Sequence, residues 1–352
     1  MLKSYKVIIF IIPHHHIGGA ERVHLEIIKS LKNKPIVVFD SSDGSVLSEE
    51  YKRNAFCFFV TNKKRKKILT YLIQIGYYLS TITLFGCNSI LFYKILSKIK
   101  NKNIKAIDLT HAFSFPEHGM EISSLKYIHL LNNRIVINNK TLDDYRILYE
   151  KNNIDSIYLD RFKIIPNGIQ IREFNLDTIL SRFNNFTIGF VGRNSPEKQP
   201  ELFFEVVRQT KIKAKAIGDN FDNFKDDFPE VDYFENCNDP EIIRTQFLEI
   251  SLLIVSSSRE GFPLVIMEAM ELGIPVISTN VGSISEHVIN EVNGYLSSVD
   301  KGAFLRFTKA KIMTIIEDKE LYRNLSLKAR EYAEQNFDIK KFNKQYRELF
   351  YE

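Results

Sequence analysis

The sequence has 352 residues, of which 44% are hydrophobic and 26% are charged. This composition excludes an intrinsically disordered chain, and the length suits two globular domains of ordinary size. The formal net charge of +5 is compatible with an anionic partner, such as a nucleotide, a phospholipid or a nucleic acid, but selects none of them. The three cysteines are widely spaced and form neither a disulfide framework nor a metal-ligand pattern, which predicts a reducing compartment.

The N-terminal apolar run, Val7 to Ile12, predicts a buried first strand. A signal peptide would have a longer apolar core and a small-residue cleavage site, whereas this run stops at Pro13. A turn at Gly18–Gly19 then leads into a helix at Ala20–Leu31, and a second strand is predicted at Pro35–Phe39.

The stretch Ile68–Tyr93 carries no charged residue and follows a run of five basic residues. Its length would admit a transmembrane helix, but it contains many polar and turn-forming residues. We expect a buried helix or helix pair in the first domain. The alternative is an interfacial element on anionic lipid, with headgroups bound by the basic run Lys63, Lys64, Arg65, Lys66 and Lys67.

The second half repeats the alternation of short apolar runs with helical patterns, which predicts parallel strands with crossover helices. Ile164–Gly168 ends in a turn-forming Pro-Asn-Gly and marks the expected domain boundary. The predicted elements are strands at Thr187–Val191, Ala214–Ile217, Leu252–Val255 and Pro275–Ser278, and helices at Pro200–Thr210 and Pro263–Leu272.

The segment from Ser256 to Met270 follows a strand and opens a helix, which is the usual place for a ligand in an open α/β sheet. Gly261 permits close approach of the backbone to a ligand, and Pro263 suits the first helical turn. The amides that follow would bind phosphate through the helix dipole and their unpaired N–H groups. Glu260 and Glu268 can both accept hydrogen bonds from sugar or ribose hydroxyls.

A second cluster, Gly192–Lys198, comes directly after the strand at Thr187–Val191. Arg193 offers a fork of donors and Lys198 a mobile point charge, so both can reach a diphosphate. Two such cations can neutralise a departing nucleoside diphosphate without a metal.

Together these segments resemble the retaining nucleotide-sugar glycosyltransferases of the GT-B fold, family four. The pattern Glu260-x7-Glu268 within the segment that begins "REGFPLVIMEAM" is specific to that family. Further segments match in the expected order: "GGAERV" at Gly18–Val23, "IIPNGI" at Ile164–Ile169, "FVGRNSPEKQPELFFEVV" at Phe190–Val207 and "NGYL" at Asn293–Leu296.

The resemblance implies an α/β protein with two doubly wound Rossmann-like domains that face a cleft. Residues 1–165 would form an acceptor-side domain and residues 166–335 the nucleotide-sugar donor domain. Residues 336–352 would form a helix that crosses back to the first domain.

The resemblance also implies roles for individual residues. Glu260 would hold hydroxyls of the donor sugar and Glu268 the ribose, while Arg193 and Lys198 would bind the diphosphate and support its departure. The other expected donor-binding residues are Gly18, Gly19, Gly192, Gly261, Phe262, Pro263, Leu264 and Val265.

No cofactor is expected, because the family usually needs no metal and no fitting Asp-x-Asp motif is present. The leaving phosphate would help to deprotonate the acceptor, so that no protein nucleophile is required. The co-substrate would be a UDP- or GDP-sugar that donates a hexose, and the acceptor would be a glycan or a lipid-linked acceptor in surface polysaccharide assembly. We expect a cytoplasmic enzyme, peripheral on the inner face of the cell membrane, that binds no nucleic acid.

Several histidines compete for a catalytic role. His129 matches the position of the family's active-site histidine after a strand, although Leu130 replaces the usual aspartate. His111, at the end of an apolar strand, is the competing candidate. His14–His16 are expected to line the donor–acceptor cleft rather than to bind a metal, because adjacent side chains of an extended chain point in alternating directions. His287 is expected to be structural.

Two other functions stay open, and a third, an oxidoreductase, is disfavoured because neither half of the sequence supplies its glycine-rich turn. A sugar-nucleotide epimerase or hydrolase would need an acid/base carboxylate array in the first domain, and an oxidoreductase would need a Gly-x-Gly-x-x-Gly turn with an acid near the ribose. A non-catalytic subunit of a polysaccharide assembly complex would not need Glu260, Arg193 and Lys198 together.

Overall fold

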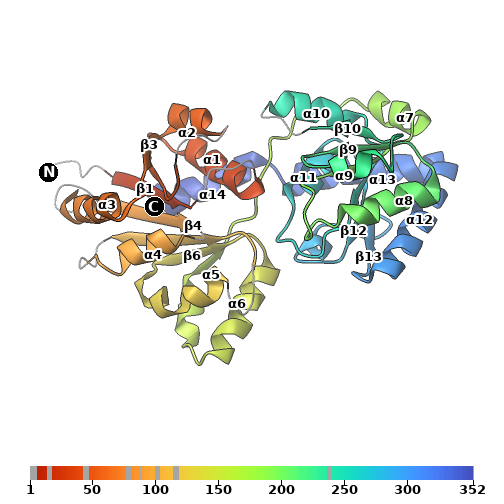
Figure 1. The fold of residues 1–352 in the computed structure, drawn as a ribbon. Helices are drawn as coiled ribbons and strands as arrows, with labels where there is room; N and C mark the ends of the chain where they lie inside the picture. The colour runs from red at the N-terminus through yellow and green to blue at the C-terminus, as the bar shows by residue number, and fades with distance from the viewer. Residues whose placement is uncertain are drawn as a thin grey trace. The chain divides into compact units, whose positions relative to one another are not determined.

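The computed structural model describes residues 6–13, 18–42, 47–76, 81–87, 89–99, 104–113, 119–235 and 239–351. The chain forms two compact units: unit 1 comprises residues 1–167 and 342–352, and unit 2 comprises residues 168–341 (Figure 1). The sequence predicts a boundary after residue 165, and the compact units divide after Asn167. The expected histidine cluster His14–His16 lies outside the described residues.

Unit 1 contains a parallel sheet in the order β3-β2-β1-β4-β5-β6-β7. Its central strands are runs of Val, Ile, Leu and Phe because a doubly covered parallel sheet is buried on both faces. The strands are β1 (Lys6–Ile12), β2 (Ile36–Phe39), β3 (Phe56–Phe59), β4 (Thr81–Cys87), β5 (Lys105–Thr110), β6 (Asn133–Val136) and β7 (Phe162–Ile164). The helices are α1 (Gly19–Ser30), α2 (Ser48–Asn54), α3 (Lys63–Gly76), α4 (Ile90–Leu96), α5 (Met120–Ser123), α6 (Asn139–Lys151) and α14 (Ile339–Tyr351), with 3₁₀ helices η1 (Leu125–Leu130) and η2 (Ser156–Arg161).

The charge-free stretch Ile68–Tyr93 is not the helix or helix pair that we expected. It comprises the end of α3, the central strand β4 and the start of α4. β4 lies between β1 and β5, and six of its seven residues are buried, which explains the absence of charge. Among the described residues, no helix combines the length and the apolar character needed to cross a bilayer.

The last helix, α14, packs against the sheet of unit 1. The ring of Phe350 lies 5.8 Å from that of Phe10 and 5.5 Å from that of Phe85. Lys105 at the start of β5 donates a hydrogen bond of 2.5 Å to the carbonyl of Leu349. The C-terminal segment therefore completes the core of unit 1.

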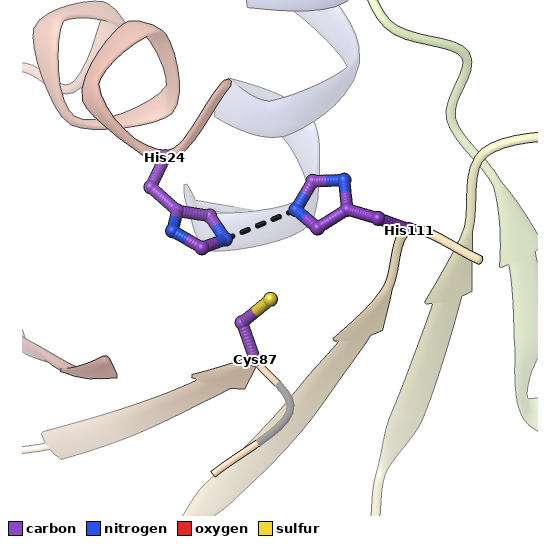
Figure 2. Close-up of side chains that lie close together, drawn as sticks. All are labelled: His24, Cys87 and His111. Carbon is purple, nitrogen blue, oxygen red and sulfur yellow. Dashed lines mark hydrogen bonds between the residues drawn. The ribbon is translucent and has the colours of Figure 1, made fainter. Parts of the chain in front are cut away.

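Three reactive side chains meet at the carboxyl edge of the unit 1 sheet (Figure 2). His24 comes from α1, Cys87 ends β4, and His111 follows β5. The two imidazoles are joined by an Nε2···Nε2 hydrogen bond of 3.0 Å. Burial lowers the pKa of both, that of His111 to about 4, so both rings are neutral at physiological pH. Burial raises the pKa of the Cys87 thiol.

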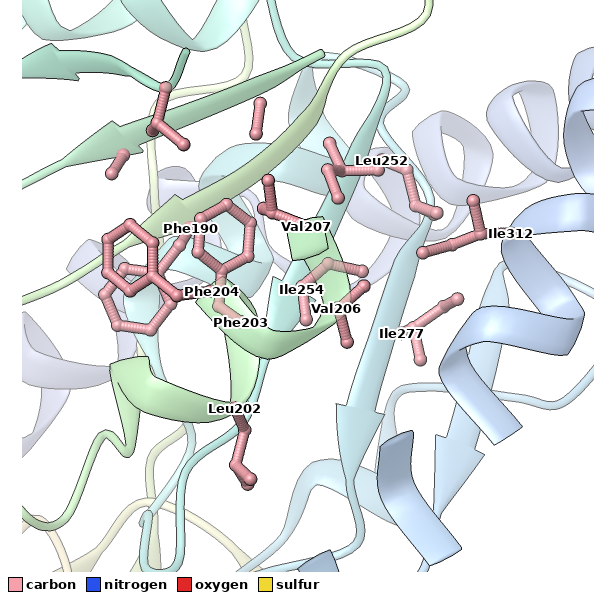
Figure 3. Packing of buried hydrophobic residues seen from close by; sticks show 14 of the residues in the cluster. Phe190, Leu202, Phe203, Phe204, Val206, Val207, Leu252, Ile254, Ile277 and Ile312 are labelled. Atoms are coloured by element: carbon pink, nitrogen blue, oxygen red, sulfur yellow. The ribbon is translucent and has the colours of Figure 1, made fainter. Parts of the chain in front are cut away.

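Unit 2 contains a second parallel sheet in the order β10-β9-β8-β11-β12-β13, and the predicted doubly wound fold is confirmed in both units. Its core is rich in phenylalanine, with Phe190, Phe203 and Phe204 packed beside Ile254 (Figure 3). The strands are β8 (Ile188–Val191), β9 (Ala214–Ile217), β10 (Asp232–Phe234), β11 (Leu252–Val255), β12 (Val276–Thr279) and β13 (Gly294–Ser297). The helices are α7 (Asp177–Asn184), α8 (Pro200–Thr210), α9 (Asp222–Lys225), α10 (Pro240–Leu248), α11 (Leu264–Glu271), α12 (Lys301–Glu317) and α13 (Lys319–Asn336), with the 3₁₀ helix η3 (Ile284–Glu286).

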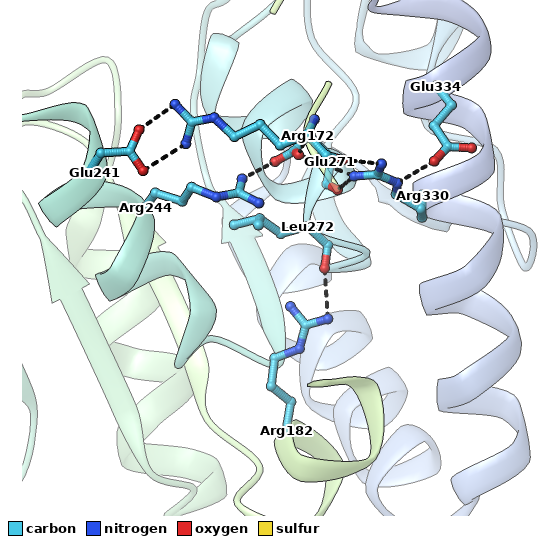
Figure 4. A network of polar contacts seen from close by, with 8 residues as sticks. All are labelled: Arg172, Arg182, Glu241, Arg244, Glu271, Leu272, Arg330 and Glu334. Atoms are coloured by element: carbon cyan, nitrogen blue, oxygen red, sulfur yellow. Dashed lines mark hydrogen bonds and ion pairs between the residues drawn. The ribbon is translucent and has the colours of Figure 1, made fainter. Parts of the chain in front are cut away.

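The C-terminal end of α11 is fixed by ionic contacts to Glu271, which is buried (Figure 4). Its carboxylate accepts hydrogen bonds from the side chains of Arg244 and Arg330 and from the backbone N–H of Arg172. A buried carboxylate is tolerated only with such partners. The network connects α11 to α10 and α13 and thereby holds in place the helix that carries Glu268.

Candidate functional site

The loops at the carboxyl edge of the unit 2 sheet carry most of the predicted site residues. β8 ends at Val191 and is followed by the loop 192–199, and β11 ends at Val255 and is followed by the loop 256–263. These two strands are neighbours in the sheet and parallel, so the two loops emerge side by side. Such an edge is where open α/β sheets bind their ligands.

Lys198 and Glu260, one from each loop, form an ion pair. The Lys198 Nζ donates a hydrogen bond of 2.5 Å to Glu260 Oε1. The lysine side chain keeps 22% of its surface exposed and the glutamate 10%, so the pair is partly desolvated but reachable. The two residues are 62 positions apart in the chain.

Serine hydroxyls fix the loop that carries Glu260. Ser257 Oγ donates to the same carboxylate oxygen as Lys198, at 2.7 Å. Ser256 Oγ lies 2.9 Å from the carbonyl oxygens of both Lys198 and Gln199. Ser256 thus connects the two loops, and Ser257 orients the carboxylate. The sequence analysis assigned no role to either serine, although both lie in the segment that it singled out.

Arg193 does not join the Lys198–Glu260 pair. Its guanidinium is 65% exposed and lies 3.1 Å from Glu197 Oε1. Arg259 contacts the other oxygen of the same carboxylate at 3.3 Å. Glu197 is therefore the local counter-ion for two arginines, a role that the sequence analysis did not assign. The exposed guanidinium of Arg193 can turn toward an anion at this edge.

The start of α11 has no side-chain cap, so the polar groups that it offers are backbone N–H groups. Pro263 is its N-cap residue and makes no side-chain capping bond. The amides after Gly261 therefore open the helix without a competing hydroxyl or carboxylate cap, which suits an anion. Leu264 and Val265 lie half-buried in the first turn, and Glu268 lies half-buried one turn further along.

Phe262 points into unit 2. Its side chain is buried, and its ring lies 4.1 Å from that of His287 and 5.5 Å from that of Phe337. His287 also shares a hydrogen bond of 3.1 Å with the hydroxyl of Tyr332. Phe262 therefore anchors the loop, and only its backbone is available to a donor. These contacts account for His287 without a catalytic role.

Two glycines of neighbouring loops pack directly onto the site backbone. Gly282, at φ +59°, lies so close to the loop after β11 that an added Cβ would be 2.1 Å from the Glu260 carbonyl oxygen. Gly218, at φ +151°, packs in the same way on Gly192, because an added Cβ on Gly218 would lie 1.9 Å from the Gly192 carbonyl oxygen.

The predicted site residues of unit 1 occupy different local structures. Gly18 is the N-cap of α1 and Gly19 its first residue. His129 is exposed in the 3₁₀ helix η1 and not at the end of a strand. His111 does follow a strand, β5, and its ring is occupied by the hydrogen bond to His24.

Residues 172–332 match the family model described as glycosyl transferases group 1. The chain is 27% identical to an uncharacterized glycosyltransferase of Methanocaldococcus jannaschii, with 93% of each chain covered. It is also 27% identical, over 46% of this chain and 50% of the relative, to the Escherichia coli UDP-Gal:α-D-GlcNAc-diphosphoundecaprenol α-1,3-galactosyltransferase. Among solved structures, Anabaena HepE in complex with UDP-glucose superposes with a TM-score of 0.77 at 20% identity, with 98% of each chain covered.

Proposed function

We propose that this chain, which has the GT-B fold and matches the group 1 glycosyl transferases over residues 172–332, is a retaining, metal-independent hexosyltransferase. Its donor is a UDP- or GDP-sugar, and its acceptor is a glycan or lipid-linked glycan of a surface polysaccharide. The observation that carries the proposal is the ion pair between Lys198 and Glu260 at the carboxyl edge of the unit 2 sheet.

Lys198 and Glu260 have different roles in the proposed reaction. When a donor enters, the Lys198 ammonium moves onto the diphosphate and neutralises the charge that develops as the nucleotide departs. The Glu260 carboxylate, still held by Ser257, accepts hydrogen bonds from the sugar hydroxyls. Arg193 adds a second cation to the diphosphate, and Glu268 binds the ribose. Two cations then do the work that a metal does in other transferases, and the leaving phosphate takes the proton of the acceptor hydroxyl.

Calorimetric titration with UDP, GDP, ADP and CMP, each with and without EDTA, measures the donor class. We expect micromolar binding of UDP, the nucleotide named for the superposing HepE complex and for the E. coli galactosyltransferase, unchanged by EDTA. Tighter binding of GDP than of UDP would indicate a GDP-sugar as the donor instead. Loss of binding in EDTA would contradict the metal-free site, and no binding of any nucleotide would favour the non-catalytic subunit.

The rival on the same fold, an epimerase or hydrolase, differs in needing no acceptor. Incubation with a UDP-sugar alone and with a lipid-linked glycan distinguishes the two. We expect nucleotide release to rise at least tenfold when the acceptor is present. Equal release in both mixtures would favour the hydrolase.

We also propose that α3 docks unit 1 on an anionic lipid surface at the inner face of the cell membrane. Ile73 of α3 is buried, and Leu69 packs on the same core. The opposite face presents exposed apolar side chains at helical spacing: Ile68, Tyr71, Leu72 and Ile75. The basic run occupies the first turns of the same helix, and Lys63, Lys64, Arg65 and Lys67 are exposed. An apolar face beside a cationic end fits the boundary between acyl chains and anionic headgroups.

Flotation with liposomes of neutral and of anionic lipid tests this docking. We expect at least a tenfold preference for anionic vesicles, lost in the double variant Tyr71→Ser, Leu72→Ser. The matched control is Ile147→Ser, which removes an equally exposed apolar side chain from α6 of the same unit. Equal flotation on both lipids would remove the membrane proposal and leave the transferase proposal intact.

A further inference from the structure

The cluster of His24, Cys87 and His111 has the composition of a transition-metal site. Their ligand atoms, two imidazole nitrogens and one thiol sulfur, all lie within 4.8 Å of one another. They come from positions far apart in the sequence, which the sheet brings together: β4 and β5 are neighbours, and α1 lies against their carboxyl ends (Figure 2). The spacing of the cysteines in the sequence does not indicate this cluster, because its three residues are distant in the chain.

The hydrogen bond between the two rings accounts for the cluster only in part. It uses one nitrogen of each imidazole, and Nδ1 of His24 has no hydrogen-bond partner among the described residues. His24 is buried, as is Cys87, so the cluster places polar atoms in the interior with few partners. Residues selected only for packing would avoid this cost by being apolar.

We infer that His24 Nε2, His111 Nε2 and Cys87 Sγ bind one zinc-type divalent cation in unit 1. Neutral imidazole and thiolate are the ligands that Zn²⁺ prefers, with Zn–N distances of about 2.0–2.1 Å and Zn–S of about 2.3 Å. The Nε2···Nε2 distance of 3.0 Å is close to that of two ligands on one tetrahedral ion. The thiol must lose its proton, which goes to solvent on binding, and the sulfur must move toward the rings.

The three ligands leave a fourth position of a tetrahedral ion for water. The ion joins α1 to β4 and β5, and it therefore stabilises the carboxyl edge of the unit 1 sheet. The inference does not rest on the proposed function, because the diphosphate contacts proposed above involve unit 2 residues alone. A metal in unit 1 is compatible with nucleotide binding that is unaffected by EDTA.

Zinc titration of metal-stripped protein, followed by calorimetry and by metal analysis after gel filtration, measures the stoichiometry. We expect one Zn²⁺ per chain, and at least a tenfold weaker affinity in Cys87→Ser and in His24→Gln. Cys57→Ser, which changes a thiol of β3 outside the cluster, is the matched control and should bind zinc as the parent does. Cobalt substituted for zinc should give a sulfur-to-metal charge-transfer band in the parent and none in Cys87→Ser.

Two outcomes would overturn the inference: no stoichiometric zinc in the parent, or zinc binding that is the same in Cys87→Ser as in the parent. Because a ligand variant can also fail to fold, thiol alkylation of the unmodified chain gives a second measurement. Zinc should slow alkylation of Cys87 at least tenfold and leave that of Cys57 unchanged. Equal rates at Cys87 with and without zinc would contradict the site. UDP binding by the same samples reports on unit 2, so that failure of the zinc site is separable from failure of the donor site.

Discussion

We expect Glu260→Ala and Lys198→Ala each to lower the turnover of sugar transfer by about a thousandfold or more without unfolding the protein. A thousandfold loss corresponds to about 4 kcal/mol of transition-state stabilisation. Lys198 is the partly desolvated cation of the site, and its removal leaves the departing diphosphate without that charge. Glu260 is held by both Lys198 and Ser257, and its removal leaves the sugar hydroxyls without that oriented carboxylate. Single-turnover rates with saturating donor measure the loss, and thermal unfolding checks the fold.

A second ion pair of unit 2 provides the matched control. Lys301 and Glu201 lie 3.2 Å apart, both largely exposed, and neither belongs to the site loops. Glu201→Ala should leave turnover within a factor of two, because exposed pairs contribute less than about 1 kcal/mol. Near-normal turnover of either site variant would remove Lys198 or Glu260 from the catalytic machinery. A loss of the same size in Glu201→Ala would show that the assay responds to stability and not to chemistry.

The site of unit 2 was largely predictable because its parts are local in sequence. A strand, a glycine-containing loop and a helix follow one another between Ile188 and Thr210 and again between Leu252 and Glu271, and each motif carries its own chemical groups. The pairing of Lys198 with Glu260 follows from topology, because β8 and β11 are neighbours and parallel. The sequences of the two strands do not indicate that they are neighbours, so the ion pair itself was not predicted. Nor was the diversion of Arg193 to Glu197, which depends on side-chain geometry inside one loop.

Unit 1 was less predictable, for two physical reasons. Its central strand β4 is apolar on both faces, so it has no alternating pattern to separate it from an apolar helix of the same composition. The cluster of His24, Cys87 and His111 exists only because the sheet order places β4 beside β5. His129 was assigned from a motif that implies a preceding strand, and the chain forms a 3₁₀ helix there instead.

The second large effect is expected at Gly282, which has no side chain to contribute and is not one of the predicted site residues. Gly282→Ala should lower turnover by about a hundredfold, because displacement of reacting groups by about 1 Å has effects of that size. The added Cβ would lie 2.1 Å from the Glu260 carbonyl oxygen and 2.7 Å from that of Gly261. Both contacts are with backbone, so the loop that carries Glu260 must shift. The φ of +59° adds strain for any residue with a Cβ.

Gly302→Ala is the matched control for this prediction. Gly302 lies in α12, where an added Cβ meets the end of the Arg306 side chain at 3.3 Å and the Asp300 carboxylate at 3.5 Å, with no backbone atom among these contacts. The change should leave turnover unaltered and raise stability by about 0.5–1 kcal/mol, as expected for alanine in a helix. If Gly282→Ala unfolded the protein, the loss of turnover would reflect backbone strain and not a displaced loop. UDP affinity is therefore measured on the same sample as a check that unit 2 is folded. Retained UDP binding with lost transfer would place the damage at the Glu260 carboxylate, since the two cationic side chains proposed to bind the diphosphate, Arg193 and Lys198, come from the other loop. Unaltered transfer in folded Gly282→Ala would mean that the exact position of the Glu260 loop does not limit the reaction.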